Sequence, residues 1–167
     1  MNNPHNEALL QRLSFLARVV NKEIQHLTYS EQRAFAEPIT VDKVRSMATD
    51  EPFAERVEAY TSRFCRLQDT VGDKLLPNWL IALGEQPGAA IDNLDRAERL
   101  GILESADQWL MIRQLRNQMV HEYIEVPEIL ANALEAAHTY QPSLIACARA
   151  VLADLERRSV LETQDRK

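Results

Sequence analysis

The sequence has few of the residues that favour sheets, tight turns or covalent cross-links. Only four glycines and two cysteines occur among 167 residues, and aromatic residues make up 6% of the chain. Ala, Leu, Arg, Glu and Gln, in contrast, are plentiful, and all of them favour helices. The hydrophobic fraction of 46% is ordinary for a folded protein. We therefore expect an all-α fold with one core, formed by a single domain over residues 1–167.

Cross-linking, secretion and membrane insertion find no support in the sequence. Cys65 and Cys147 stand alone, without a CxxC pattern or a histidine pair at metal-ligand spacing. No basic segment followed by an apolar run opens the chain, so we expect reduced thiols in a cytoplasmic protein. The longest apolar stretch, residues 144–153, contains Arg149 and is shorter than the roughly 20 residues of a membrane span. We expect no membrane association, no metal and no cofactor.

The chain also lacks an overall excess of basic residues, because its formal net charge is -6. This charge argues against a general nucleic-acid coat, although a local basic cleft remains compatible with it. Arg56, Arg63 and Arg66 share one expected helix. They either form such a basic edge or lie on an ordinary solvated face.

The hydrophobic periodicity predicts four main helices and one or two short ones. Apolar residues recur at steps of three and four in residues 7–29, 53–71, 109–119 and 130–155. The heptad-like spacing of the second segment suits nearly antiparallel packing, so we expect an up-and-down four-helix bundle. The polar tail from about residue 160 is expected to fray.

Capping residues, glycine and proline mark the ends of the expected helices. Residues typical of N-caps precede three of them: Thr40, Asp50, and Ser105 with Gln108 in a capping-box pattern. Gly101 should end a short helix over residues 89–100. Pro127 suits the first turn of the last helix. Pro77 should kink or end one helix, and Pro142 should bend or split the last one.

Polar side chains interrupt the apolar pattern of one expected helix. Because successive residues turn by about 100°, Arg113, Asn117 and His121 form one stripe. Arg116 and Tyr123 form a second, neighbouring stripe. Both stripes flank the apolar seam of the helix, as in a helix that lines a cleft or a subunit interface.

The side chains of these stripes suit RNA cleavage without a metal. A histidine such as His121 can accept the 2′-hydroxyl proton or protonate the leaving oxygen. The guanidinium of Arg116 can bind a phosphate while negative charge develops, and Asn117 can orient either group. The same residue types occur on ordinary helix surfaces, so the pattern alone leaves both readings open.

The segment Arg116-Asn-Gln-Met-Val-His121-Glu-Tyr123 resembles the Arg-x4-His-x-Tyr motif of HEPN-domain proteins, in particular the HepT toxin branch. Asn117 matches the polar residue that often follows the arginine in that motif. The motif also lies late in a helix that precedes a final long helix, as in that family. Residues 66–76 are similar to a segment of some HepT-like relatives.

The resemblance implies a HEPN four-helix bundle that forms a homodimer, with the motif helices of both subunits lining one cleft. It implies a toxin that is a metal-independent endoribonuclease acting on tRNA or mRNA. Arg116 and His121 would be catalytic, with Asn117 in support. Tyr123 would receive AMP from an MNT-type nucleotidyltransferase antitoxin, which silences the cleft.

Two further residues are candidates for supporting roles. Arg113 shares the stripe of His121, and Asp69 either faces the cleft and orients a catalytic group or lies on the surface in an ion pair. Arg116 and His121 diverge by about 140° on an ideal helix, so a second subunit is expected to complete the site. Residues 78–104 exceed what a minimal HEPN bundle needs and are expected to cover the cleft or enlarge the interface.

Two alternatives to a ribonuclease remain open. A non-catalytic helical adaptor, or substrate-binding partner of a nucleotidyltransferase, would use the same seam and the acidic charge. A structural helical dimer would carry the motif incidentally. Outside the motif helix, Trp79 and Trp109 are expected to anchor the core, and His5, His26 and His138 to lie at the surface or its boundary.

Overall fold

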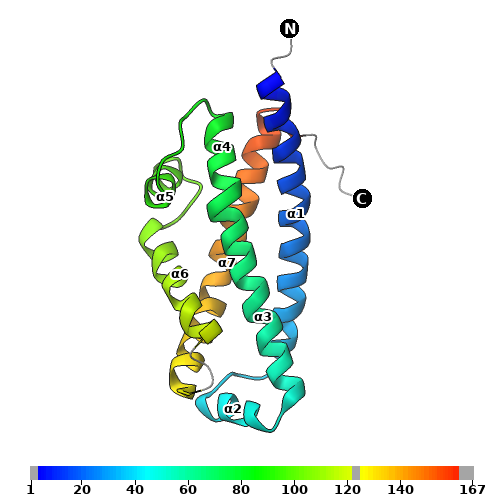
Figure 1. Cartoon of the computed structure of the whole chain (residues 1–167), viewed down its shortest axis with the longest axis vertical. Coiled ribbons are helices and arrows are strands. Elements are labelled where there is room, and N and C mark those ends of the chain that lie inside the picture. The colour runs from blue at the N-terminus through cyan, green and yellow to red at the C-terminus, as the bar shows by residue number, and fades with distance from the viewer. Residues whose placement is uncertain (1–3, 122–124, 162–167) are drawn as a thin grey trace. The chain divides into compact units, whose positions relative to one another are not determined.

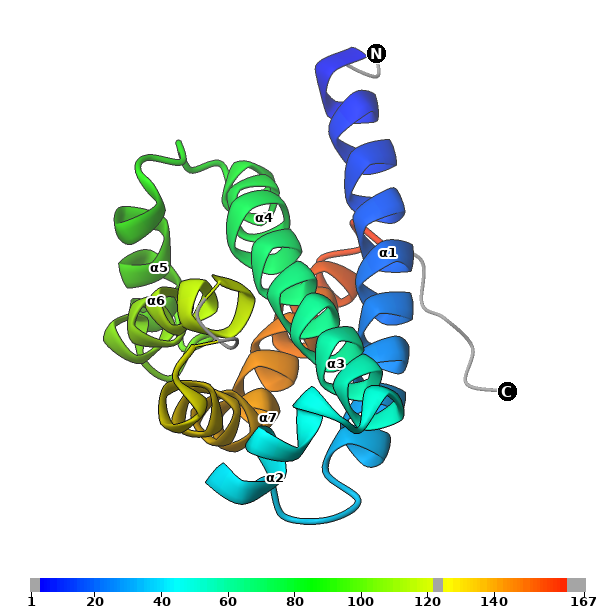
Figure 2. The same ribbon diagram turned by 60° about the horizontal axis from the view of Figure 1, so that its bottom comes forward.

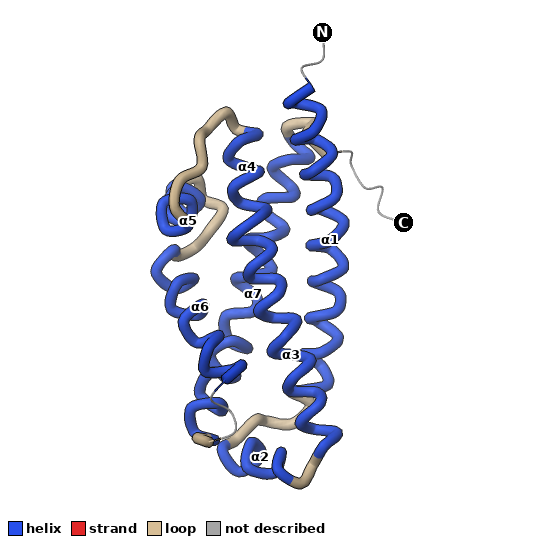
Figure 3. Tube along the Cα trace, in the orientation of Figure 1, coloured by secondary structure: helices blue, strands red, loops and turns tan. Residues whose placement is uncertain are grey.

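The structure, a computed structural model, describes residues 4–121 and 125–161, without the side chain of Asn117. Every regular element in these ranges is a helix, which confirms the predicted all-α fold (Figures 1 and 3). The elements are α1 (Pro4–Ala34), α2 (Val41–Arg45), a 3-10 turn (Ser46–Ala48), α3 (Glu51–Asp69), a π-helical segment (Thr70–Leu75), α4 (Leu76–Ala82), α5 (Ala90–Arg99), α6 (Ala106–His121) and α7 (Pro127–Arg157).

The chain divides into two compact units, each assembled from separate parts of the sequence. The first unit consists of Met1–Lys22, Asp69–Ala106 and Ser143–Lys167, and the second consists of Glu23–Gln68 and Asp107–Pro142. The expected single domain and the up-and-down four-helix bundle therefore stay predictions. No helix among the described residues is long and apolar enough to cross a membrane.

In the first unit, Trp79 of α4 is the main anchor. Its side chain is 1% exposed, and Nε1 donates a 2.8 Å hydrogen bond to Oδ2 of Asp154 on α7. Asp154 in turn accepts from Arg157, the last residue of α7, and from Arg158, which follows it. Trp79 is thus a core anchor, as predicted, and its indole N–H is satisfied by a buried carboxylate.

Two glycines end helices in the first unit. Gly84 has a φ of +79° and Gly101 a φ of +74°, a region that residues with a Cβ rarely adopt. After each glycine, an N–H returns to the carbonyl five residues earlier, from Glu85 to Leu80 and from Ile102 to Ala97. These bonds satisfy carbonyls at the helix end, and the predicted end of α5 at Gly101 is confirmed.

The C-terminal end of α7 closes in the same way around Ser159, whose φ is +56°. Val160 and Leu161 both donate to the carbonyl of Leu155, and Leu161 is buried. The chain is therefore still held at residues 160 and 161, where fraying was expected to begin. The rest of the expected frayed tail, residues 162–167, lies outside the described residues.

The two internal prolines do not end their helices. Pro77 is the second residue of α4, and the helical backbone continues from the π-helical segment into α4. A π turn is wider than an α turn, which gives room for the ring of Pro77 beside the preceding carbonyls. Pro142 lies inside the uninterrupted α7. The helix therefore does not end at Pro77, and α7 is not split at Pro142, so these two alternatives are wrong, whereas a kink at Pro77 and a bend at Pro142 stay predictions.

In the second unit, the predicted N-caps are confirmed. The side chain of Thr40 accepts from the backbone N–H of Lys43, and Oδ1 of Asp50 accepts from that of Phe53. The C-terminal part of α1 lies beside α3 in both views (Figures 1 and 2). Arg63 of α3 joins these two helices through hydrogen bonds to α1.

Both cysteines are free and buried, as the sequence predicts for core thiols. Burial raises the pKa of the Cys147 thiol to about 12. Because the thiolate is the reactive form, this raised pKa lowers the reactivity of Cys147 at neutral pH. Neither cysteine contributes chemistry to the surface of the protein.

Candidate active site on helix α6

Helix α6 presents its apolar seam to the interior of the second unit. Trp109, Ile112 and Met119 are each less than 5% exposed, whereas Leu115 is half-buried. Three members of the predicted seam are therefore confirmed as core residues. Their burial fixes which face of α6 remains open to solvent.

Contacts with neighbouring helices hold α6 in place. Nε2 of Gln68, which is buried on α3, donates a 3.2 Å hydrogen bond to the backbone carbonyl of Trp109. The Trp109 ring meets the ring of Tyr140 on α7 edge to face, with centroids 6.5 Å apart. The N–H of Ala106, the first residue of α6, donates to Oε2 of Glu98 on α5, so a carboxylate from the preceding helix caps α6.

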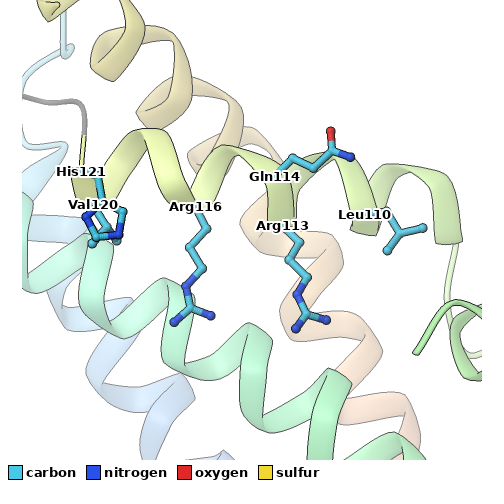
Figure 4. A pocket seen from close by; sticks show the side chains of 6 residues that line it. All are labelled: Leu110, Arg113, Gln114, Arg116, Val120 and His121. Carbon is cyan, nitrogen blue, oxygen red and sulfur yellow. The ribbon is translucent and has the colours of Figure 1, made fainter. Parts of the chain in front are cut away.

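A concavity of about 540 Å³ lies along the open face of α6 (Figure 4). Among the described residues, those that line it come from α6: Leu110, Arg113, Gln114, Arg116, Val120 and His121. Arg113 and Arg116 extend from the same side of the helix, and the His121 ring lies on that side, whereas Gln114 points to the opposite side (Figure 4). Three nitrogen-bearing side chains of the predicted site thus share one concavity.

Arg116 and His121 share this concavity despite their angular separation. They differ by about 140° around an ideal helix, and Val120 lies between them at about 40° from Arg116. Arg116 is half-buried and His121 is exposed, so the two side chains start from different faces. The long arginine side chain bridges the difference.

Three of the predicted site residues are not placed in the concavity. The side chain of Asn117 and the whole of Tyr123 lie outside what the structure describes. Asp69, the last residue of α3, is half-buried and belongs to the first unit, whereas the concavity belongs to the second. Their supporting and modification roles stay predictions.

Two exposed apolar residues on α6 were not expected from the sequence. Val120 is 41% exposed and lines the concavity beside His121, whereas Met111 is 56% exposed and lies about 180° from Val120 around the helix. An apolar residue on the solvent side of the α6 helical wheel was the available signal. Val120 and Leu110 give the concavity a mixed character, cationic and apolar.

His138 was expected to be a boundary residue without an informative partner. It is half-buried, as predicted, but its Nε2 lies 3.0 Å from Oε1 of Glu31 and its ring stacks on Phe35 at 3.8 Å. Oε2 of Glu31 accepts from Gln141, which accepts from the hydroxyl of Tyr60. A polar network therefore links α1, α3 and α7 beneath the surface of the second unit.

Neither metal ligation nor family membership adds to this picture. No group of three or more His, Cys, Asp or Glu side chains in the described part of the chain is arranged to hold a metal ion. Comparisons with protein-family models, with curated proteins and with solved structures find no match. The candidate site therefore depends on the residues of α6 themselves.

Proposed function

We propose that the protein is an endoribonuclease of the HEPN type, the HepT-like toxin of a toxin–antitoxin pair in the cytoplasm. The observation that carries the proposal is the shared concavity of Arg113, Arg116 and His121. It is supported by the likeness of residues 116–123 to the Arg-x4-His-x-Tyr motif and by the all-helical fold. The up-and-down four-helix bundle belongs to the same proposal.

In the proposed reaction, the imidazole of His121 removes the proton from a 2′-hydroxyl of the RNA. The resulting oxygen attacks the adjacent phosphorus, and the bond to the 5′-oxygen breaks. The products are a 2′,3′-cyclic phosphate and a 5′-hydroxyl, which takes up a proton. Arg116 and Arg113 bind the phosphate oxygens while negative charge develops on them. The reaction requires no metal ion.

A second copy of the chain would complete this site. In the described part of the chain the concavity is lined by α6, so these residues of one protomer would enclose the RNA on one side. In a homodimer with facing α6 helices, one His121 would act as base and the other would protonate the leaving oxygen. The exposed Val120, which lines the concavity, provides apolar area for such an interface.

The direct test is incubation of the purified protein with tRNA and mRNA in EDTA. We expect cleavage by the wild type, and a loss of about 10²- to 10³-fold in Arg116→Ala and His121→Ala. Gln114→Ala is the matched control, because Gln114 lines the same concavity without a charge or a titrating proton. Intact RNA with the wild type, or equal cleavage by His121→Ala, contradicts the proposal.

An exposed apolar residue of α6 also favours a second function. A non-catalytic adaptor could dock a nucleotidyltransferase on Met111, which is 56% exposed and lies about 180° around α6 from Val120. That function predicts a stable complex with the enzyme, no RNA cleavage by the free protein, and loss of the complex in Met111→Asp. Failure to capture a nucleotidyltransferase with the wild type counts against it.

A further inference from the structure

A second concavity, of about 250 Å³, lies between α1 and α3 within the second unit. We call it the α1–α3 groove. It is lined by Tyr29, Ser30 and Arg33 of α1 and by Pro52, Glu55, Arg56, Ala59 and Arg63 of α3. None of these residues lines the α6 concavity, so the groove is a separate feature of the surface.

The groove is locally basic in an acidic protein. Arg33, Arg56 and Arg63 face a single lining carboxylate, that of Glu55, although the net charge of the chain is -6. In the described ranges, none of the three arginines takes part in an ion pair. Their positive charge is therefore available to an anionic ligand.

The groove includes two of the three arginines of α3 that were considered as a basic edge. Arg56 and Arg63 line it together, whereas Arg66 is exposed and is not among its lining residues. Arg33, from α1, joins them, which the pattern of α3 alone does not indicate. A basic edge of all three α3 arginines stays a prediction.

Arg63 is held in position before any ligand arrives. Its Nη1 donates to the backbone carbonyl of His26 at 3.1 Å and to Oγ of Ser30 at 2.6 Å. Neither bond uses Nη2 or Nε, so these N–H groups remain for a phosphate oxygen. Because the side chain is already ordered, anion binding costs little further rotamer entropy.

Tyr29 adds an aromatic surface at the edge of the groove. The residue is 56% exposed, and the guanidinium carbon of Arg33 lies 5.6 Å from its ring centroid. An exposed aromatic ring next to arginines is the combination that binds single-stranded nucleic acid, with phosphates at the cations and a base on the ring. An inorganic anion alone would make no use of the ring.

We propose that the α1–α3 groove binds single-stranded RNA, with phosphates at Arg33, Arg56 and Arg63 and one base stacked on Tyr29. The choice of RNA as the ligand rests on the proposed ribonuclease function. The groove then holds substrate at a place distinct from the cleavage residues of α6. It explains how an acidic protein engages a polyanion.

The test measures the binding of a short fluorescein-labelled oligoadenylate by fluorescence anisotropy. All variants are made in an Arg116→Ala/His121→Ala background, which keeps the RNA intact and removes the α6 contacts. Arg33→Glu/Arg56→Glu should bind at least tenfold more weakly. The slope of its log binding constant against log salt concentration should become shallower by about 0.7 for each phosphate contact that is lost. Arg12→Glu/Arg18→Glu, on exposed positions of α1, is the control with the same change in net charge.

Tyr29 gives an independent arm of the test. Tyr29→Ala should weaken binding about tenfold without changing the salt dependence, and Tyr29→Phe should retain wild-type affinity because the ring is kept. Equal binding by the groove variant and the Arg12→Glu/Arg18→Glu control overturns the proposal. Weakened binding together with no cleavage by the otherwise wild-type protein leaves the groove standing and refutes the ribonuclease. Cleavage by the otherwise wild-type protein, together with unchanged RNA binding by the groove variants, supports the ribonuclease and refutes RNA binding in the groove.

Discussion

Gln68 and Trp109 are joined by a hydrogen bond from a buried amide on α3 to the backbone of the motif helix. The donor is 2% exposed, and the acceptor carbonyl belongs to a residue whose side chain is 1% exposed. The two residues are 41 positions apart in the chain. This bond and the edge contact of Trp109 with Tyr140 attach α6 to two neighbouring helices.

Replacing Gln68 by leucine removes this hydrogen bond at similar side-chain volume. We expect the free energy of unfolding to fall by about 1 kcal/mol, the usual net value of such a bond. Urea denaturation followed by circular dichroism measures the change. Gln25→Leu, at an exposed position of α1, is the control and should stay within about 0.5 kcal/mol of the wild type. Equal stability of the two variants would mean that Gln68 does not hold α6.

The polar network around Tyr60 predicts a loss of stability at high pH. Burial of the phenol raises the pKa of Tyr60 above its ordinary value of 10.0. Electrostatic repulsion from Glu31, and to a smaller extent from Cys65, raises it further. A raised phenol pKa contributes stability that is present below pH 10.0 and is lost as the pH rises toward the folded value. Above pH 10.0 the unfolded state releases this proton while the folded state keeps it.

Tyr60→Phe removes this titration and the hydrogen bond to Gln141. We expect it to be about 1 kcal/mol less stable than the wild type at neutral pH. Above about pH 10 the difference should shrink by up to about 1.4 kcal/mol per pH unit. Urea titrations over this pH range give the difference, and Tyr29→Phe, an exposed tyrosine, is the control. A difference between wild type and Tyr60→Phe that does not change with pH contradicts the role of Tyr60.

The helices could be predicted because their information is local. Apolar steps of three and four identified α1, α3, α6 and α7, and Thr40, Asp50 and Gly101 marked ends that the structure confirms. Pro77 shows where such reasoning fails. A kink or an end was expected there, but not the π-helical segment before the ring, in which Val71 and Leu75 are buried in the core.

The candidate site could be predicted in part for the same reason. Arg113 and His121 lie on one stripe of one helix, so their spacing indicated a common surface, whereas the concavity they share with Arg116 was not indicated by the divergence of about 140° between Arg116 and His121. Contacts between helices were not visible in the sequence, because nothing local marks Gln68 as the partner of Trp109, or Arg33 as the neighbour of Arg56. Such pairs are set by tertiary packing, which the periodicity of single helices does not contain.

Asp154 predicts a loss of stability in acid. Burial by itself raises the pKa of this carboxyl, but hydrogen bonds from Trp79, Arg158 and Arg157 outweigh burial and hold the pKa below the ordinary 3.8. A depressed carboxyl pKa contributes stability that is present above pH 3.8 and is lost as the pH falls through the folded value.

Asp154→Asn removes this titration. At neutral pH we expect the variant to be about 2 kcal/mol less stable than the wild type, because charge-assisted hydrogen bonds are lost. The difference should narrow as the pH falls below about 4. Thermal unfolding over an acid pH series measures it, with Asp95→Asn, on the exposed side of α5, as the control for the loss of one carboxylate. A difference that stays constant into acid would show that the charge of Asp154 is not what Trp79 and the arginines bind.

Tyr123 provides the last prediction, which concerns control of the proposed toxin. If the tyrosine of the motif receives AMP, co-expression with an MNT-type nucleotidyltransferase should add the mass of one or more AMP groups to the protein. Tyr123→Phe should abolish the addition, because the phenol oxygen that bonds to phosphorus is missing, while Tyr29→Phe should keep it. Intact-protein mass spectrometry measures this directly. The modified protein should also lose RNA cleavage, because AMP phosphates placed two residues from His121 bring negative charge to the α6 concavity. An addition that persists in Tyr123→Phe places the modification on another residue.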